Sequence, residues 1–228
     1  KTKTFYALCV LLSIIAVVAY TKWRTRSIEQ EKKILEEKVA ERTAELAQKN
    51  RDITSSIEYA KRIQEAILPE IKEIKKHFPE SFVYYQPKDI VSGDFFWFGL
   101  KNGKKIIAAV DCTGHGVPGA FMSMIGHNLL SQIVMEMGET NPGKILDQLS
   151  LGVRNALKQG THSVETRDGM DIALCVFDSD DKSLTYSGAF RPLILIRKGE
   201  LTKYEGDKFS IGGLATGENQ KFQSHKVD

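Results

Sequence analysis

The dipeptide Asn102-Gly103 stands between two apolar runs, FFWFGL and KKIIAAV, and it constrains the fold of this chain more than any other feature. A two-residue type I′ turn requires positive φ at both central positions, so Asn-Gly at this place predicts a β-hairpin. The turn also sets the pairing of the two strands, and this pairing puts Asp94 opposite Asp111 with β-carbons about 5 Å apart. The sequence therefore predicts two facing carboxylates at the open end of a hairpin.

Two facing carboxylates repel each other, and the aromatic run Phe95, Phe96 and Trp97 beside them makes their desolvation costly. A divalent cation such as Mg²⁺ or Mn²⁺ would resolve the conflict, because it favours carboxylate, carbonyl and water ligands. The alternative is a β-bulge that separates the two aspartates into solvated turn residues. The glycines around His115 let the backbone approach a metal or phosphate, and His115 is either a proton donor or an ordinary loop residue.

From about Phe78 onward, the period of the apolar residues becomes strand-like and turn residues recur at short intervals. Proline at the first turn of two helical stretches, 117–137 and 141–158, suits their starts. We expect an α/β fold of the α+β sandwich type, with antiparallel sheets flanked by helices. The predicted strands are Phe82–Gln86, Phe95–Leu100, Lys105–Val110, Met170–Asp178, Ser183–Ala189, Leu193–Arg197 and Glu200–Tyr204.

An apolar run near the start of the chain, FYALCVLLSIIAVVAY, is nearly long enough to cross about 30 Å of hydrocarbon as a helix. A buried core helix or a signal-peptide core would show a similar run. More Lys and Arg residues follow the run than precede it, so the positive-inside rule places the chain after residue 21 in the cytoplasm. We expect a transmembrane helix at residues 4–21 and localisation to the inner (cytoplasmic) membrane.

The segment 22–69 has the pattern of a coiled coil. No Gly or Pro occurs between Ser27 and Leu68, and Pro69 ends the pattern. Polar residues interrupt the heptad seam, which is compatible with a helix that shifts or rotates. We expect a homodimer whose helix relays a signal from the membrane; the alternative is a passive spacer. The apolar a and d positions are Ile28, Leu35, Val39, Leu46, Ile53, Ala60, Ile63 and Ile67.

Charge and cysteine content exclude several classes of protein. The net charge is only +3, and the basic residues gather near the amino end, so we expect no nucleic-acid partner. The 3 cysteines, Cys9, Cys112 and Cys175, are far apart and form no C-x-x-C pair. This spacing argues against a disulfide framework and against a structural zinc site.

Five motifs follow one another in the order SGDFFW, DCTGHGVPGAFMS, GMDIAL, YSGAFRPLILIR and FSIGG. In this order they resemble the SpoIIE-like branch of the PPM metal-dependent serine/threonine protein phosphatases, over about residues 70–228. The upstream segment EYAKRIQEAILPE resembles the helix that commonly enters this domain. We therefore expect a phosphatase domain at residues 70–228, in the cytoplasm, behind a membrane anchor and a coiled-coil linker.

The resemblance implies a two-metal hydrolase that uses Mn²⁺ or Mg²⁺ and water against phosphoserine or phosphothreonine, with no phosphoenzyme. Asp94 and Asp111 match the family's first metal-ligand positions, and Cys112 would contribute only its backbone carbonyl. Asp168 and Asp171 lie near the region that can help to hold a third metal. The implied substrate is a phosphorylated signalling protein similar to an anti-sigma-factor antagonist.

The chain departs from the family pattern in two places. The family continues beyond FSIGG to a Thr-Asp-Gly motif and a final aspartate, whereas this chain stops at Asp228 before both. We therefore expect the domain to be truncated at its C-terminus and this fragment to be inactive, while the full-length protein is active. Phe190 and Arg191 replace the His-x-Pro that is more usual in the family, a change that bears on substrate preference.

Two other functions remain open from the sequence. A pseudophosphatase would bind a phosphorylated partner as a scaffold without hydrolysing it. A diguanylate-cyclase-like domain is the less favoured reading: SGDFF resembles a Gly-Gly-Asp-Glu-Phe turn, but Phe95 stands where an acidic residue is needed. A cyclase would also leave the Asp-Cys-Thr-Gly-His-Gly motif unexplained.

Overall fold

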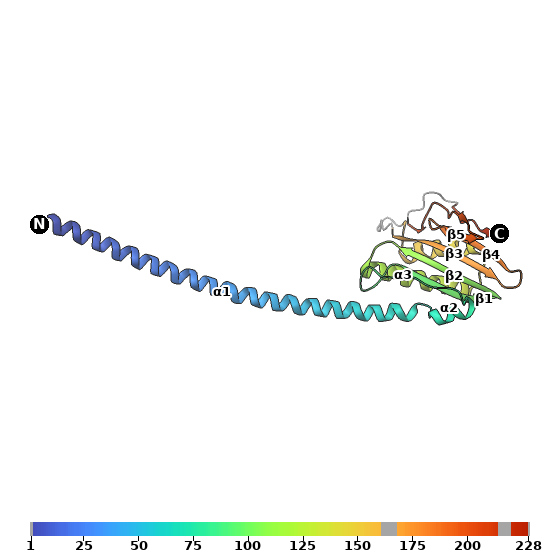
Figure 1. Cartoon of the computed structure of the whole chain (residues 1–228), viewed down its shortest axis with the longest axis horizontal. Coiled ribbons are helices and arrows are strands. Elements are labelled where there is room, and N and C mark those ends of the chain that lie inside the picture. Colours follow the sequence, from blue (N-terminus) through green and yellow to red (C-terminus); the bar gives the residue numbers. More distant parts are fainter. Residues whose placement is uncertain (1, 161–167, 214–219, 228) are drawn as a thin grey trace. The chain divides into compact units, whose positions relative to one another are not determined.

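The structure, a computed structural model, describes residues 2–160, 168–213 and 220–227 (Figure 1). The chain divides into two units, residues 1–55 and 56–228, which are described separately below. The helices are α1 (Thr2–Ile67), α2 (Ile71–His77), α3 (Gly116–Ser131), the π-helix η1 (Gln132–Glu136) and α4 (Pro142–Ala156). The strands are β1 (Phe95–Lys101), β2 (Lys104–Cys112), β3 (Gly169–Asp178), β4 (Ser183–Ala189), β5 (Leu193–Arg197), β6 (Glu200–Tyr204), β7 (Ile211–Gly212) and β8 (His225–Val227).

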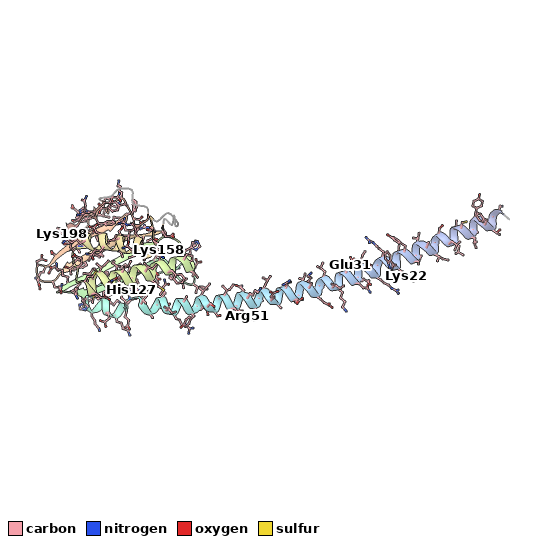
Figure 2. The ribbon with its side chains drawn as sticks, turned by 180° about the vertical axis from the view of Figure 1, so that it is seen from behind. Lys22, Glu31, Arg51, His127, Lys158 and Lys198 are labelled. Carbon is pink, nitrogen blue, oxygen red and sulfur yellow. The ribbon has the colours of Figure 1, made fainter. Side chains whose placement is uncertain are left out.

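The first unit is helical, and its helix α1 continues into the second unit as far as Ile67. The helix ends just before Pro69, whose ring disfavours helical geometry at the preceding residue. Its amino-terminal part is long and apolar enough to span a membrane, a test that some core helices and signal sequences also pass. Beyond that part, charged side chains such as Lys22, Glu31 and Arg51 project from the helix (Figure 2). The predicted seam residues Ile28, Leu35, Val39 and Leu46 are exposed in the single chain.

The second unit is built on an antiparallel sheet in the order β1, β2, β3, β4 and β8, with the short β7 paired to β3. Strands β2, β3 and β4 lie side by side in Figure 1. Strands β5 and β6 form a separate two-stranded hairpin. This mixed architecture of antiparallel sheets and helices confirms the predicted fold class.

The two faces of the sheet have different partners. Alternate residues such as Ile106, Ala108 and Leu174 belong to the main core, which also contains Leu146 and Leu149 of α4. Because side chains alternate across a strand, the intervening residues point to the opposite face. There Ile107, Ala173 and Cys175 belong to a smaller cluster that includes Leu193 and Leu195 of β5 and Tyr204 of β6. Helices therefore cover one face, and the β5–β6 hairpin partly covers the other.

The hairpin prediction is confirmed in detail. Asn102 and Gly103 have φ of 49° and 74°, the positive values that a type I′ turn requires. The register runs from Lys101 opposite Lys104 to Phe95 opposite Val110 without a bulge. The strands predicted at β1 to β6 and the two helical stretches are all present, although the last turn of the first stretch is the π-helix η1.

The predicted strand at Phe82–Gln86 is wrong. These residues have the alternating exposure of a strand, with Phe82 85% and Tyr84 81% exposed, yet they pair with no described strand. The apolar and aromatic pattern predicts an extended backbone, but a strand also needs a neighbour whose amides and carbonyls complete its ladder.

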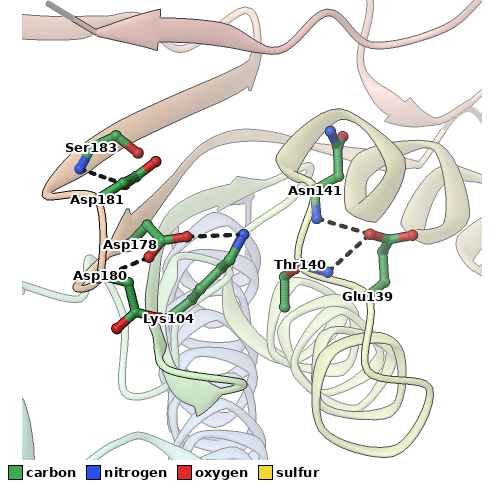
Figure 3. A network of polar contacts seen from close by, with 8 residues as sticks. All are labelled: Lys104, Glu139, Thr140, Asn141, Asp178, Asp180, Asp181 and Ser183. Atoms are coloured by element: carbon green, nitrogen blue, oxygen red, sulfur yellow. Dashed lines mark hydrogen bonds and ion pairs between the residues drawn. The ribbon is translucent and has the colours of Figure 1, made fainter.

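A network of polar side chains closes the sheet at its hairpin end (Figure 3). Lys104 lies 3.2 Å from the carboxylate of Asp178 on the paired strand β3. Nearby, Asn141 caps α4 by accepting a hydrogen bond from the backbone amide of Lys144 at 3.0 Å. The acidic residues described next lie at the opposite end of β2 and β3, where Asp111 pairs with Asp171.

Candidate active site

Three aspartates lie in a row across neighbouring strands at the end of the sheet opposite the Asn-Gly turn. Asp111 is paired directly with Asp171 across β2 and β3, and Asp94 immediately precedes β1 in the register that leads to Asp111. All three occupy alternate positions on the face away from α3 and α4, because Val110, Cys112 and Ile172 belong to the helix-covered core. The structure thus brings together three sequence-predicted site residues, here called the acid row.

The carboxyl groups of Asp94 and Asp111 are close enough to affect each other. Partial burial is the largest cause that raises the pKa of Asp94, although part of this residue is open to solvent. The negative charge of Asp111 and a hydrogen bond between the two carboxyls raise the pKa of Asp94 further, while the charge of Arg191 opposes the shift. Asp171 accepts a hydrogen bond from the hydroxyl of Ser210 at 2.8 Å, which holds its carboxylate in place.

Arg191 is the cation that faces this row. Its guanidinium donates a hydrogen bond to the Asp111 carboxylate and lies 3.7 Å from the Asp171 carboxylate. From the sequence, Arg191 was noted only because it departs from the His-x-Pro pattern that is more usual in the family. Its role as a partner of the acid row was missed, because 80 residues separate it from Asp111.

Three glycines lock the turn before β1 against the loop after β2. A β-carbon on Gly93 would lie 2.8 Å from the carbonyl of Gly114 and 3.3 Å from that of Cys112. A β-carbon on Gly119, in the first turn of α3, would lie 2.6 Å from the same Gly114 oxygen. Such contacts are too short for a side chain, so glycine at these positions permits the close backbone approach. This approach positions both Asp94 and Asp111.

Gln64, near the end of α1, also holds this turn. Its buried side-chain amide donates hydrogen bonds to the Ser92 carbonyl at 2.6 Å and to the Ser123 hydroxyl at 2.7 Å, and it accepts one from the Ser92 amide at 3.0 Å. Sequence reasoning missed Gln64, since one glutamine in a polar helix resembles any surface residue. The only signal for a buried Gln64 was its position near the helix end, two residues before the apolar pair Ala66 and Ile67.

His115 is directed toward a residue that the sequence did not single out. Its Nδ1 lies 2.8 Å from the carboxylate of Asp89, in the loop before β1. His115 precedes α3 and its side chain is 71% exposed. The pairing with Asp89 orients the imidazole at the mouth of the loop that follows Asp111.

The remaining predicted site residues differ in their surroundings. The Cys112 side chain is buried in the main core, and burial is the largest cause that raises the pKa of its thiol. The thiol is therefore not directed toward the acid row, while the Cys112 carbonyl lies beside Gly93. Asp168 precedes β3, and its carbonyl accepts a hydrogen bond from Gln159. Asp168 is therefore not part of the acid row, in which Asp171 is the residue paired with Asp111.

A pocket of about 710 Å³ extends from the acid row along the open face of the sheet. Asp94, Asp111 and Arg191 line its acidic end, and Ala109 and Ala173 line its floor. Tyr85 contributes one wall, and its hydroxyl lies 3.3 Å from the Asp94 carbonyl as a hydrogen-bond donor. The pocket can therefore take a ligand with a charged group at one end and an extended body.

The donor atoms of the site suit a hard divalent cation. Carboxylate oxygens from the acid row and the Cys112 carbonyl are the oxygen ligands that Mg²⁺ and Mn²⁺ favour. Within residues 2–160, 168–213 and 220–227, no three His, Cys, Asp or Glu side chains converge on one point as a closed metal site. Two adjacent carboxylates with a third on the next strand form an open arrangement of donors.

The chain is similar to known proteins in both sequence and structure. Residues 101–228 match the family described as Stage II sporulation protein E (SpoIIE). The structure is similar to the SiaA-PP2C domain of Pseudomonas aeruginosa, with a TM-score of 0.66 and 28% identity over 78% of this chain and 68% of that chain. It is also similar to the PP2C phosphatase domain, with a fragment of the regulatory domain, of the cell fate determinant SpoIIE from Bacillus subtilis. In that case the TM-score is 0.47 and the identity 20%, over 60% of this chain and 38% of that chain.

No curated protein matches the chain in sequence. The family match nevertheless covers more than half of the 228 residues; it begins at Lys101, the last residue of β1, so it includes β2 with Asp111 and leaves Asp94 outside. The structural likeness adds a PP2C phosphatase domain at 28% identity, which indicates a phosphatase-family function. The chain therefore belongs to the SpoIIE family, and its second unit has the fold of a PP2C-type phosphatase domain.

Proposed function

We propose that this protein is a divalent-metal-dependent phosphatase that hydrolyses phosphoserine or phosphothreonine on a signalling protein. The observation that carries the proposal is the adjacent pair Asp94 and Asp111 at one end of a pocket, with Asp171 beside Asp111 on the next strand. Neighbouring carboxylates repel each other, and divalent cations bound between them offset this repulsion. The carboxylates of the row and the match to the SpoIIE family both support the proposal of a metal-dependent phosphatase.

The residues have separate roles in this proposal. Asp94, Asp111 and the Cys112 carbonyl would hold Mn²⁺ or Mg²⁺, and Asp171 would help to hold a further ion; Asp168 is a second candidate for that ion. When bound, the ions lower the pKa of water and neutralise phosphoryl oxygens. His115, oriented by Asp89, would give a proton to the departing serine or threonine oxygen.

The substrate in this proposal is a phosphorylated protein of the anti-sigma-factor antagonist type. A pocket whose floor is formed by small side chains such as Ala109 and Ala173 leaves room for a peptide segment beside the phosphorylated residue. The charged end of the pocket would receive the phosphoryl group together with its cations.

The domain organisation is part of the proposal. Residues 4–21 would anchor the protein in the inner membrane, residues 22–69 would form a homodimeric coiled coil, and residues 70–228 would be the cytoplasmic phosphatase domain. Support comes from the apolar start of α1 and from the exposed heptad residues that follow it. A helix of this kind would relay the state of a membrane-proximal sensor to the domain.

Release of phosphate from a phosphoserine protein by the full-length protein, measured with and without Mn²⁺, tests the proposed function. We expect Asp94→Asn and Asp111→Asn to abolish the Mn²⁺-dependent rate, because each removes a charged cation ligand. Asp180→Asn is the matched control, since Asp180 lies at the hairpin end of the sheet (Figure 3). The expected inactivity of the 228-residue chain is tested by comparing its rate with that of the full-length protein.

The same experiment separates the enzyme from its rivals. Binding of the phosphoprotein without phosphate release, in a full-length protein that binds Mn²⁺, would identify a scaffold. Unchanged rates in Asp94→Asn and Asp111→Asn would overturn the assignment of the acid row.

A further inference from the structure

Arg191 is positioned against the acid row by a rigid backbone. Tyr186 donates a hydrogen bond to the Arg191 carbonyl, and the preceding residue Phe190 donates from its amide to the Asp207 carbonyl at 2.8 Å. Phe190 has a φ of 55°, a left-handed conformation that side-chain-bearing residues rarely adopt. The backbone at residue 191 is therefore held by two neighbouring segments.

Two glycines, Gly188 and Gly206, allow the neighbouring backbone to approach the Arg191 carbonyl closely. A β-carbon on Gly188 would lie 2.6 Å from the Arg191 carbonyl, and one on Gly206 would lie 3.2 Å from it. The segments that contain these glycines are also joined by a hydrogen bond of 2.8 Å from the Asp207 amide to the Gly188 carbonyl. With the backbone held in this way, only the side chain of Arg191 is left to move.

The guanidinium of Arg191 engages carboxylate oxygens that a cation would need. It donates to Oδ2 of Asp111 and lies 3.7 Å from Oδ2 of Asp171. Asp111 is a proposed ligand of the first cation and Asp171 of a further one. An arginine and a divalent cation cannot occupy the same oxygen lone pairs, so one must give way to the other.

Exposure decides which of the two gives way. The side chains of Arg191 and Asp111 are 49% and 47% exposed. Ion pairs in such surroundings contribute only about 0.2–1 kcal/mol, because water screens them. A doubly charged ion held by several oxygens can displace a pair of that strength.

We propose that Arg191 is an internal counter-ion that competes with the divalent cation for Asp111 and Asp171 and so sets how tightly the cation binds. The proposal rests on the proposed function, because it requires the acid row to be a cation site. Arg191 neutralises the row while the cation is absent and swings out of it when the cation enters. Cation loading thereby includes a rearrangement of this one side chain.

Mn²⁺ binding to the purified full-length protein, measured by calorimetric titration, tests the competition without any activity assay. We expect Arg191→Met to lower the Kd for Mn²⁺ by a factor between about 1.4 and about 5, because a pair of about 0.2–1 kcal/mol no longer opposes binding. Arg191→Lys keeps the charge and should shift the Kd less. Arg197→Met removes the same charge from an exposed position of β5 and should leave the Kd unchanged.

The possible failures differ from one another. Equal Kd values in the wild type and Arg191→Met, with both proteins folded by circular dichroism, overturn the competition and leave the proposed function intact. Weaker binding in Arg191→Met also overturns it and makes Arg191 a supporter of the cation site. Absence of Mn²⁺ binding in all four proteins overturns the cation site itself, and the competition with it. If Arg191→Met does not fold, Arg191→Gln replaces it in the same comparison.

Discussion

The side-chain amide of Gln64 donates to the Ser92 carbonyl at 2.6 Å and accepts from the Ser92 amide at 3.0 Å, so it pairs with both backbone groups of a residue 28 positions away. These groups belong to the turn that leads into Asp94. Gln64 and Ser92 are 4% and 6% exposed, so water does not easily replace either bond. The last turns of α1 are therefore tied to the backbone that carries the first residue of the acid row.

Gln64→Ala should destabilise the second unit, because it leaves buried backbone groups of Ser92 without partners. Unsatisfied buried groups of this kind cost about 1–3 kcal/mol. Urea unfolding followed by the fluorescence of the buried Trp97 measures the loss. Gln30→Ala, at an exposed position of α1, is the control and should leave the midpoint unchanged. A wild-type midpoint in Gln64→Ala would show that the three hydrogen bonds contribute nothing.

Gly93→Ala should be more harmful than an ordinary glycine substitution, because the new methyl group meets the fixed carbonyl of Gly114 at 2.8 Å. Overpacking of this kind costs about 1–3 kcal/mol and shifts the backbone next to Asp94. Gly199→Ala is the comparison: its methyl group meets nothing within 4 Å, and only its φ of 84° resists the change. We expect Gly93→Ala alone to weaken Mn²⁺ binding. Equal binding in the two variants would refute the positioning role of Gly93.

The stability of the second unit should fall in mild acid because of His127. His127 is labelled in Figure 2. Burial lowers its pKa in the folded protein, although a hydrogen bond with Asn128 opposes the shift, and its Nδ1 has no partner among the described residues. The unfolded chain therefore takes up the proton first as the pH falls through about 6.5. The contribution of neutral His127 is complete above that pH and is lost below it. Urea unfolding at pH 7.5 and 5.5 should show a smaller difference for His127→Gln than for the wild type.

The cap of α4 can be tested by a pair of variants. Asn141→Ala removes the side-chain oxygen that accepts from the Lys144 amide and should cost about 1 kcal/mol of unfolding free energy. Asn141→Asp keeps an oxygen at the same place and should retain most of the stability. If both variants unfold at the same urea concentration, the cap is not the source of the effect.

Dimer formation through the proposed coiled coil depends on its apolar seam. Leu46→Glu places a charge at a heptad position that is 67% exposed in the single chain, and it should convert a dimer to a monomer. Ala47→Glu adds the same charge one position along the helix, outside the seam. Sedimentation of the two variants in detergent gives the comparison. An unchanged dimer in Leu46→Glu would argue for a different interface.

Local patterns predicted the elements that local interactions determine. The Asn102-Gly103 turn specified a register that the structure confirms rung by rung, and strands β1 to β6 lie where alternation of apolar residues placed them. The same reasoning gave the wrong result for Phe82–Gln86, because a strand depends on a neighbour that the segment itself does not encode. The pairing of Asp111 with Asp171 required the order of strands in the sheet, which no local pattern contains.

Long-range contacts explain what sequence reasoning missed at the site. Asp89 beside His115, Gln64 beside Ser92 and Arg191 beside Asp111 are pairs of residues separated by 26, 28 and 80 positions. Each partner is a common polar residue without a motif of its own. Their roles follow from packing of the chain, so the sequence could nominate the carboxylates but not the groups that hold or neutralise them.

Two aspartates of the acid row, Asp111 and Asp171, lie on neighbouring strands of one hydrogen-bonded sheet, and Asp94 directly precedes the strand on the other side of Asp111. The separation of neighbouring strands is about 4.8 Å in every such sheet and is maintained by backbone bonds alone. Insertions, deletions or substitutions in the surrounding loops can thus alter which proteins reach the site while the spacing of its oxygen donors stays constant. The loops can therefore change substrate recognition during evolution while the sheet keeps the positions of the cation-binding oxygens.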